Sequence, residues 1–192
     1  MTKRTANVSV RNNTDNAIVA ISIVHKYSDD YTNEGQWGII APGELAEDTM
    51  EVEYNTGAFT TGRDWWVVTW FNPEMTTQYF SDPENFRNII DALEKVAPSA
   101  VGAAAGAIAG LASSWTGPGA IAARQAAKRV AKMATEQLTN DESTDGFKQH
   151  ILRSEDEDEL TEIVINEDLT ITFKSNSGDS ETVSSSREVE QE

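Results

Sequence analysis

The stretch Thr60-Thr61-Gly62-Arg63-Asp64-Trp65-Trp66-Val67-Val68-Thr69-Trp70-Phe71 decides the fold. It holds three of the chain's five tryptophans, and neither glycine nor proline follows Gly62 within it. Side chains alternate between the two faces of a β-strand. The two faces carry Trp66, Val68 and Trp70 on one side, and Trp65, Val67 and Phe71 on the other. Because both faces are apolar, we expect a central strand with a covering layer on each side.

The segments before this strand also have strand character. Residues 6–12 and 49–55 alternate between apolar and polar side chains, and residues 18–27 are rich in β-branched residues. A polar loop is expected at 28–35, before a short strand at 36–40. Turn residues separate these segments, which is the pattern of a sandwich or barrel.

After residue 81 the hydrophobic period changes from two to 3.6, which predicts helices. Asp82-Pro83-Glu84 is typical of a helix start, and we expect this first helix to cover the outer face of the tryptophan strand. An Ala/Gly-rich segment follows at 99–113, and a further helix is predicted at about 120–138. Strand patterns return from residue 147.

The fold class that follows is mainly β: a β-sandwich with an inserted helical segment of about three helices. We expect a single domain, with sandwich strands at 5–80 and 147–185 and the helical segment at 82–138. Residues 186–192 are predicted to be an acidic disordered tail, because they are polar and charged.

Composition excludes several functions. The net charge of −17 argues against nucleic acid as a partner, because phosphate binding needs a basic surface. Without cysteine there is no disulfide, thiolate catalysis or cysteine-bound zinc. The N-terminal residues lack the apolar core of a signal peptide, so we expect a cytoplasmic protein.

No catalytic signature is present in the sequence. The Gly-x-Ser-x-Gly, phosphate-loop and calcium-loop patterns are absent. Glu51 and Glu53 share one strand face, but neighbouring carboxylates are expected by chance among 32 acidic residues. His25 and His150 do not have the spacing of a helical zinc site. We therefore expect a protein that is not an enzyme, with no catalytic residue, no cofactor and no metal.

The most specific motif is the glycine spacing at Gly102, Gly106 and Gly110. Glycines at every fourth position form a flat ridge that lets a second helix approach closely. No charged residue occurs from Val96 to Ala123, a run long enough to cross a bilayer, but its Ala and Gly favour insertion poorly. The favoured interpretation is a tight helical hairpin within the protein, and the alternative is a hairpin that enters a membrane.

Two further features adjoin the glycines. Trp115 lies between the two small-residue helices and is either a membrane or partner anchor or a core residue. The basic row, which we define as Arg124, Lys128, Arg129 and Lys132, holds four of the fifteen basic residues. It faces anionic lipid, or it is a solvated helix face whose cations favour the negative end of the helix dipole.

Several segments of this chain resemble the PUD family, proteins up-regulated in long-lived insulin-receptor mutants of nematodes, with relatives in fungi. The segments are Val24-His25-Lys26-Tyr27-Ser28, Glu34-Gly35-Gln36-Trp37-Gly38, Val52-Glu53-Tyr54-Asn55-Thr56-Gly57, Thr61-Gly62-Arg63-Asp64-Trp65-Trp66 and Gly146-Phe147-Lys148-Gln149-His150-Ile151-Leu152. The resemblance implies a β-sandwich, an intracellular setting and pairing of two such chains. It implies no enzymatic activity and no catalytic residue.

Together, these observations predict a non-enzymatic interaction protein, and the resemblance to the PUD family implies that it forms a homodimer or heterodimer with a protein partner. The alternative is a membrane-active sandwich protein that uses the helical hairpin to bind lipid or form a pore. The predicted contact residues for a partner or membrane are Gly102, Gly106, Gly110, Trp115, Arg124, Lys128 and Lys132.

Overall fold

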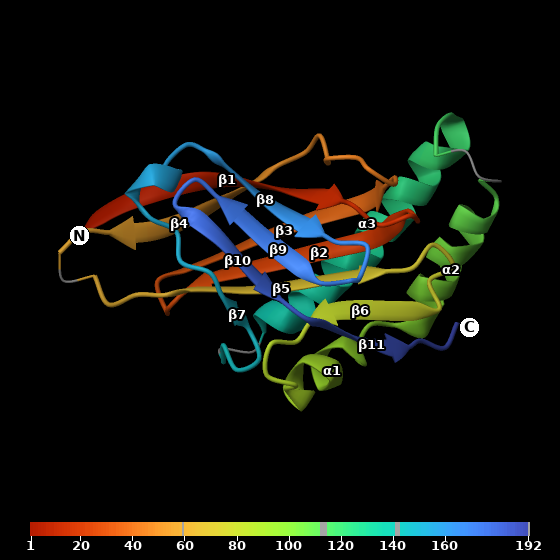
Figure 1. The fold of residues 1–192 in the computed structure, drawn as a ribbon. Helices are drawn as coiled ribbons and strands as arrows, with labels where there is room; N and C mark the ends of the chain where they lie inside the picture. The colour runs from red at the N-terminus through yellow and green to blue at the C-terminus, as the bar shows by residue number, and fades with distance from the viewer. Residues whose placement is uncertain (59, 112–114, 141–142, 192) are drawn as a thin grey trace.

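The computed structural model describes residues 1–58, 60–111, 115–140 and 143–191. It shows two β-sheets packed face to face, with helices against the outer face of one of them (Figure 1). The predicted fold class, a β-sandwich with an inserted helical segment, is confirmed. The strands are β1 (Thr2–Asn12), β2 (Ile18–Tyr27), β3 (Tyr31–Ile40), β4 (Met50–Thr56), β5 (Asp64–Phe71), β6 (Thr77–Ser81), β7 (Lys148–Gln149), β8 (Leu160–Ile165), β9 (Ile171–Ser175), β10 (Gly178–Thr182) and β11 (Ser184–Glu188). The helices are α1 (Arg87–Leu93), α2 (Pro98–Ala109) and α3 (Pro118–Thr139), and η1 (Ser154–Asp156) is one 3₁₀ turn.

Each sheet combines strands from before and after the helices. One sheet has the order β10-β9-β8-β1-β4, and the other has the order β11-β6-β5-β2-β3, with β7 paired to β5. The strands β1 and β8 run parallel, with Asn7 opposite Leu160 at one end of the pair and Asn12 opposite Ile165 at the other. This pairing joins the two halves of the chain into one sandwich, from which the helices extend as an insertion.

The strand β5 is covered on both faces, as its sequence predicts. Trp66, Val68 and Trp70 lie in the core between the two sheets. Val67 and Phe71 lie in a second core, between β5 and the helices. The second sheet is therefore the middle layer of the molecule, and each of its faces needs a separate cover.

The helical layer corrects two predictions. The first helix begins at Arg87 instead of residues 82–84, because Asn85 has a left-handed backbone conformation (φ 57°) that a helix does not contain. The side chain of Asp82 accepts a hydrogen bond from the Phe86 N–H (2.9 Å) in the turn before the helix. The cover on the middle layer comes mainly from α3, which contacts β2, β3 and β5, whereas α1 packs against α3.

Two polar segments form strands that the sequence does not predict. Residues 31–35 belong to β3 instead of a loop, and residues 186–188 belong to β11 instead of a disordered tail. Edge strands of this kind are held by backbone hydrogen bonds, which leave no hydrophobic pattern. Arg187 also fixes β11, since it donates hydrogen bonds to Gln78 Oε1 (2.9 Å) and to the Leu93 carbonyl (2.7 Å).

A buried polar cluster lies where β5 begins. Asp64 accepts a hydrogen bond from His25 Nε2 (2.8 Å) through one carboxylate oxygen and from the Leu152 N–H (3.0 Å) through the other. The Trp66 indole N–H donates to the His150 carbonyl (2.9 Å). These bonds join β5 to β2 and to the segment after the helices, so the cluster fixes where the insertion returns to the sandwich.

His150 is buried beside this cluster. Its Nδ1 lies 2.8 Å from Ser180 Oγ and its ring stacks on Phe173, but its Nε2 has no partner among the described atoms. Burial lowers the pKa of His150 to about 4, from the 6.5 of an exposed histidine. Between these two values the unfolded chain binds one more proton at this residue than the folded chain does. Stability therefore falls as the pH drops through this window.

We predict that the His150→Gln variant has a flatter pH dependence of stability than the wild type. Between pH 7 and pH 5 the wild type should lose about 2 kcal/mol more unfolding free energy than the variant, because one pKa unit corresponds to 1.36 kcal/mol. Urea unfolding at a series of pH values measures this difference. Parallel curves for the two proteins would show that His150 takes up its proton equally in both states.

Candidate functional site

The predicted contact residues lie on two neighbouring helices and between them; α2 is at one end of the sandwich, and α3 extends from there across the outer face of the middle sheet (Figure 1). They are Gly102 and Gly106 in α2, Gly110 directly after it, Trp115 in the turn, and Arg124, Lys128 and Lys132 in α3. The structure links the turn to α3, because Arg124 Nη2 donates a hydrogen bond to the Trp115 carbonyl (3.2 Å). The predicted residues therefore form one continuous region with two different surfaces.

The first surface is the outward side of α2, which corrects the favoured interpretation of the glycine spacing. The helix turns Val101, Ala104 and Ile108 towards the core, because these side chains bury more apolar area than glycine does. The glycines are on the opposite side, and a Cβ atom at Gly106 would meet nothing within 4 Å. The glycine ridge therefore does not pack against α3. We define the small-residue face as Gly102, Ala103, Gly106, Ala109 and Gly110, which are exposed except for the half-buried Gly102.

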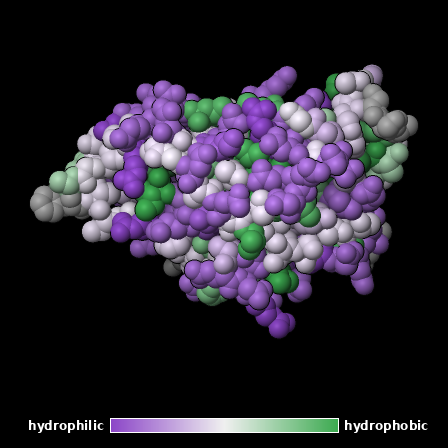
Figure 2. Space-filling view, viewed as in Figure 1, coloured by the Kyte–Doolittle hydropathy of each residue, from purple (hydrophilic) through white to green (hydrophobic). Residues whose placement is uncertain are grey.

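An open groove of about 670 Å³ runs beside the small-residue face. Trp115, half-buried, and Leu111 line it at the turn, and Pro73 and Glu74 line it from the β5–β6 connection. Gln191 reaches the same groove and donates a hydrogen bond to the Glu74 carbonyl (2.7 Å). The groove extends the mostly apolar surface of α2 to the end of the sandwich. Figure 2 shows hydrophilic residues over most of the viewed face, with several of the scattered hydrophobic ones at this end.

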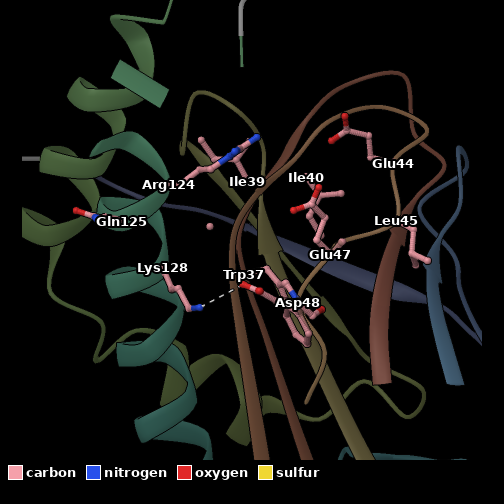
Figure 3. Close-up of a pocket in the computed structure, with 12 residues that line it drawn as sticks. Trp37, Ile39, Ile40, Glu44, Leu45, Glu47, Asp48, Arg124, Gln125 and Lys128 are labelled. Carbon is pink, nitrogen blue, oxygen red and sulfur yellow. Dashed lines mark hydrogen bonds and ion pairs between the residues drawn. The ribbon is translucent and has the colours of Figure 1, made fainter. Parts of the chain in front are cut away.

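A second hollow separates α3 from the connection between β3 and β4 (Figure 3). This cleft has a volume of about 420 Å³, with Arg124 and Lys128 on the helix side and the acidic segment 44–48 on the other. Lys128 Nζ lies 3.8 Å from Asp48 Oδ2 across it. At its floor, the Trp37 indole N–H donates to the Asp48 carbonyl (2.9 Å). Because one wall is basic and the other is acidic, the cleft is not suited to a ligand of a single charge sign.

Gly38 determines how close α3 comes to β3 beside this cleft. A Cβ atom at Gly38 would lie 2.3 Å from the Arg124 carbonyl oxygen, which is well inside contact distance. Only glycine therefore allows the helix backbone to rest directly on the strand. This contact sets the distance between the middle sheet and the part of α3 that carries Arg124.

The second surface is the basic row, whose four residues are all exposed. The interpretation based on the helix dipole is not supported, because the last turn of α3 contains no basic residue and the dipole acts mainly within a terminal turn. Lys128 and Lys132 form long ion pairs with Asp48 (3.8 Å) and Glu136 (4.0 Å). No described residue forms an ion pair with Arg129. The row therefore projects from the middle of the helix into solvent.

The other ionisable groups considered from the sequence do not assemble into a site. Glu53 pairs with Lys3, while Glu51 is exposed on the same strand. His25 is bound by Asp64 and Asn33, and His150 lies beside Ser180. Within the described part of the chain, no three acidic or histidine side chains are placed to hold a metal ion.

Sequence reasoning did not place three residues in this region. Trp37 and Asp48 line the cleft, and Ile121 is 60% exposed at the start of α3. The signal for Ile121 was available, because it precedes Gln125 by four positions and Lys128 by seven, which places an apolar residue on the basic side of the helix. Trp37 and Asp48 come together only through the fold, so the sequence alone gives no such signal.

Comparison with known proteins identifies the family. The sequence model PUD1_2, described as "Up-Regulated in long-lived daf-2", matches residues 2–184. The chain belongs to this family. The resemblance found in the sequence is thus confirmed, and it extends across the helices as well as the strands. A comparison with curated proteins found no match. The description of the PUD family concerns when its members are abundant and names no molecular activity.

The uncharged run of this PUD-family chain does not form one long helix. Within this run, residues 98–109 form α2 and residues 118–123 form the first turns of α3, while residues 112–114 lie outside the described part of the chain. Among the described residues, no helix combines the length and the hydropathy that crossing a membrane requires.

Two glycine substitutions test the packing of the helical layer. We predict that Gly38→Ala lowers the free energy of unfolding by about 1–3 kcal/mol, because the new methyl group collides with the backbone of α3. Gly106→Ala is the matched control, and it should raise stability by up to about 1 kcal/mol through its helix propensity. Urea unfolding of both variants measures the two effects. A destabilising Gly106→Ala would contradict the exposed position of that glycine.

A double-mutant cycle tests whether the basic row stabilises the fold. Lys128→Ala and Asp48→Ala, singly and together, should show a coupling energy below about 0.5 kcal/mol, because the pair is long and exposed. The measurement is urea unfolding of the four proteins. A coupling above about 1 kcal/mol would give the row a structural role across the cleft.

Proposed function

We propose that this member of the PUD family is a non-enzymatic, intracellular interaction protein that pairs with a second copy of itself or with a close relative. The small-residue face of α2 is the proposed contact surface. The observation that carries the proposal is the exposure of Gly106, on a helix whose opposite side is fully used in the core. Each glycine in a helix costs about 1 kcal/mol relative to alanine. Close packing of a second helix against the glycine ridge would offset this cost.

Charge supports the same surface. Two copies of a chain with net charge −17 repel each other, so they associate most easily through surfaces without charge. The small-residue face carries no charged side chain, and the groove beside it is lined by one charged residue, Glu74. Association through this face therefore avoids burying unpaired carboxylates.

Shape supports a second copy as the partner. A two-fold interface places the same patch of both chains in contact, so the patch must be complementary to itself. A flat ridge of glycine and alanine meets this requirement, because two such ridges allow close contact between helix backbones. Leu111 and Trp115 at the edge of the groove add apolar side chains to the rim of such an interface.

We predict that Gly106→Leu abolishes pairing without unfolding the protein. The leucine side chain has room on the isolated chain but keeps two α2 helices apart. Sedimentation equilibrium over a range of concentrations measures the mass. The wild type should approach twice its 21.0 kDa monomer mass, and the variant should stay monomeric.

Gln125→Leu is the matched control, since it adds a similar apolar area at an exposed position of α3. This variant should pair like the wild type, and urea unfolding should show that all three proteins are folded. A wild type that stays monomeric, or a Gly106→Leu variant that still pairs, would refute pairing through α2.

A further inference from the structure

The helical region has an unusual distribution of acidic residues. From Val96 to Thr135 the sequence contains no Asp or Glu, although the chain has 32 of them. This is the longest acid-free stretch of the protein, and it contains the four residues of the basic row. A strongly acidic molecule thus contains a long acid-free stretch whose only charged residues are the four cations of the basic row, all in α3.

Helix stability does not explain this distribution. Asp and Glu stabilise the first turn of a helix through its dipole, and Ser, Thr, Asp or Asn at the N-cap add a hydrogen bond. The first turns of α2 and α3 contain no acidic residue, and neither helix has a side-chain cap. Acidic residues would be favourable at these positions, so their absence calls for an explanation outside the isolated fold.

The exposed side of α3 combines the basic row with an apolar residue. Ile121, Gln125, Lys128 and Lys132 follow one another at intervals of three or four positions, so they lie on one stripe. Ile121 is 60% exposed at the N-terminal end of this stripe, close to the turn that contains Trp115. From Ile121 to Lys132 the stripe extends about 16 Å along the helix, at 1.5 Å per residue.

We infer that the basic row and Ile121 form a docking surface for an anionic lipid bilayer, with α3 lying along the membrane plane. Clusters of Lys and Arg bind the headgroups of anionic membranes, and an exposed apolar side chain beside them can enter the interface. A straight stripe on one exposed helix also matches a flat partner. No crossing of the membrane is involved.

Other anionic partners fit the region less well. A second copy related by a two-fold axis would place the basic row against itself, which is repulsive. An acidic protein segment would satisfy the lysines and arginines but would leave Ile121 without an apolar environment. An anionic bilayer satisfies both the basic residues and Ile121, since headgroup phosphates and acyl chains lie side by side at its interface.

The net charge of the protein does not prevent this docking. Screening limits charge interactions to about 10 Å at 0.1 M salt, so carboxylates on the far side of the sandwich contribute little. The nearby acidic residues are Glu44, Glu47 and Asp48 across the cleft and Glu136 on α3. The ion pairs of Asp48 and Glu136 with the row are long and exposed, so lipid phosphates can replace them at small cost.

The test is flotation of the full chain with phosphatidylcholine vesicles, with and without phosphatidylserine. We expect binding only to the phosphatidylserine vesicles, and we expect it to weaken when salt is raised from about 0.1 M to about 0.5 M. Lys128→Glu/Lys132→Glu should weaken binding about thirtyfold or more, since each basic residue near an anionic membrane contributes about 1 kcal/mol. Ile121→Ser should weaken it severalfold.

Lys95→Glu/Lys174→Glu is the matched control, because it changes net charge equally at exposed lysines outside the basic row. This control should keep binding, as should Gly106→Leu, which separates lipid docking from pairing through α2. Failure to bind phosphatidylserine vesicles, equal binding to neutral vesicles, or equal losses in the two double variants would overturn the proposal. Binding to soluble poly-glutamate but not to vesicles would overturn it in favour of an acidic protein partner.

Discussion

The structure depends on the need to cover both faces of β5. Trp66 and Trp70 point between the sheets while Val67 and Phe71 point to the helices, and all four are nearly or fully buried. Each such side chain contributes about 1.5–3 kcal/mol when it leaves water, so neither face could be left exposed. One sheet covers the first face, and the helical insertion covers the second. The inward sides of α2 and α3 are thus committed to the core, and their outward sides remain exposed.

The sequence predicts the parts of the fold that depend on side-chain burial. The apolar faces around Trp66 and Val67 indicate a middle sheet, and the 3.6-residue period indicates helices. The prediction from sequence fails where backbone hydrogen bonds or backbone conformation, and not side-chain burial, determine the structure. Residues 31–35 and 186–188 belong to polar edge strands held by backbone pairing, and the left-handed Asn85 delays the start of α1. Such features leave little trace in hydrophobic patterns.

The candidate site was predictable in its residues but not in its orientation. The spacing of Gly102, Gly106 and Gly110 places them on one side of a helix, yet spacing alone does not say which side faces the core. Val101, Ala104 and Ile108 determine the orientation, because their greater apolar area turns them inward. Trp37 and Asp48, by contrast, belong to the region only because β3 and its connection to β4 fold against α3.

The two outward surfaces differ in the kind of partner that physics permits. A neutral, flat face such as that of α2 can meet its own copy, because self-contact through it brings no like charges together. A basic face such as that of α3 cannot, since a two-fold axis would oppose Arg124 and Lys128 to themselves. Pairing through α2 therefore leaves the basic row free in both copies, and a dimer would present two such rows. If both rows reach one flat anionic surface, the second contact forms at high effective concentration and binding strengthens without any new residue. The separation of neutral and basic residues onto adjacent helices would make the two proposed associations compatible.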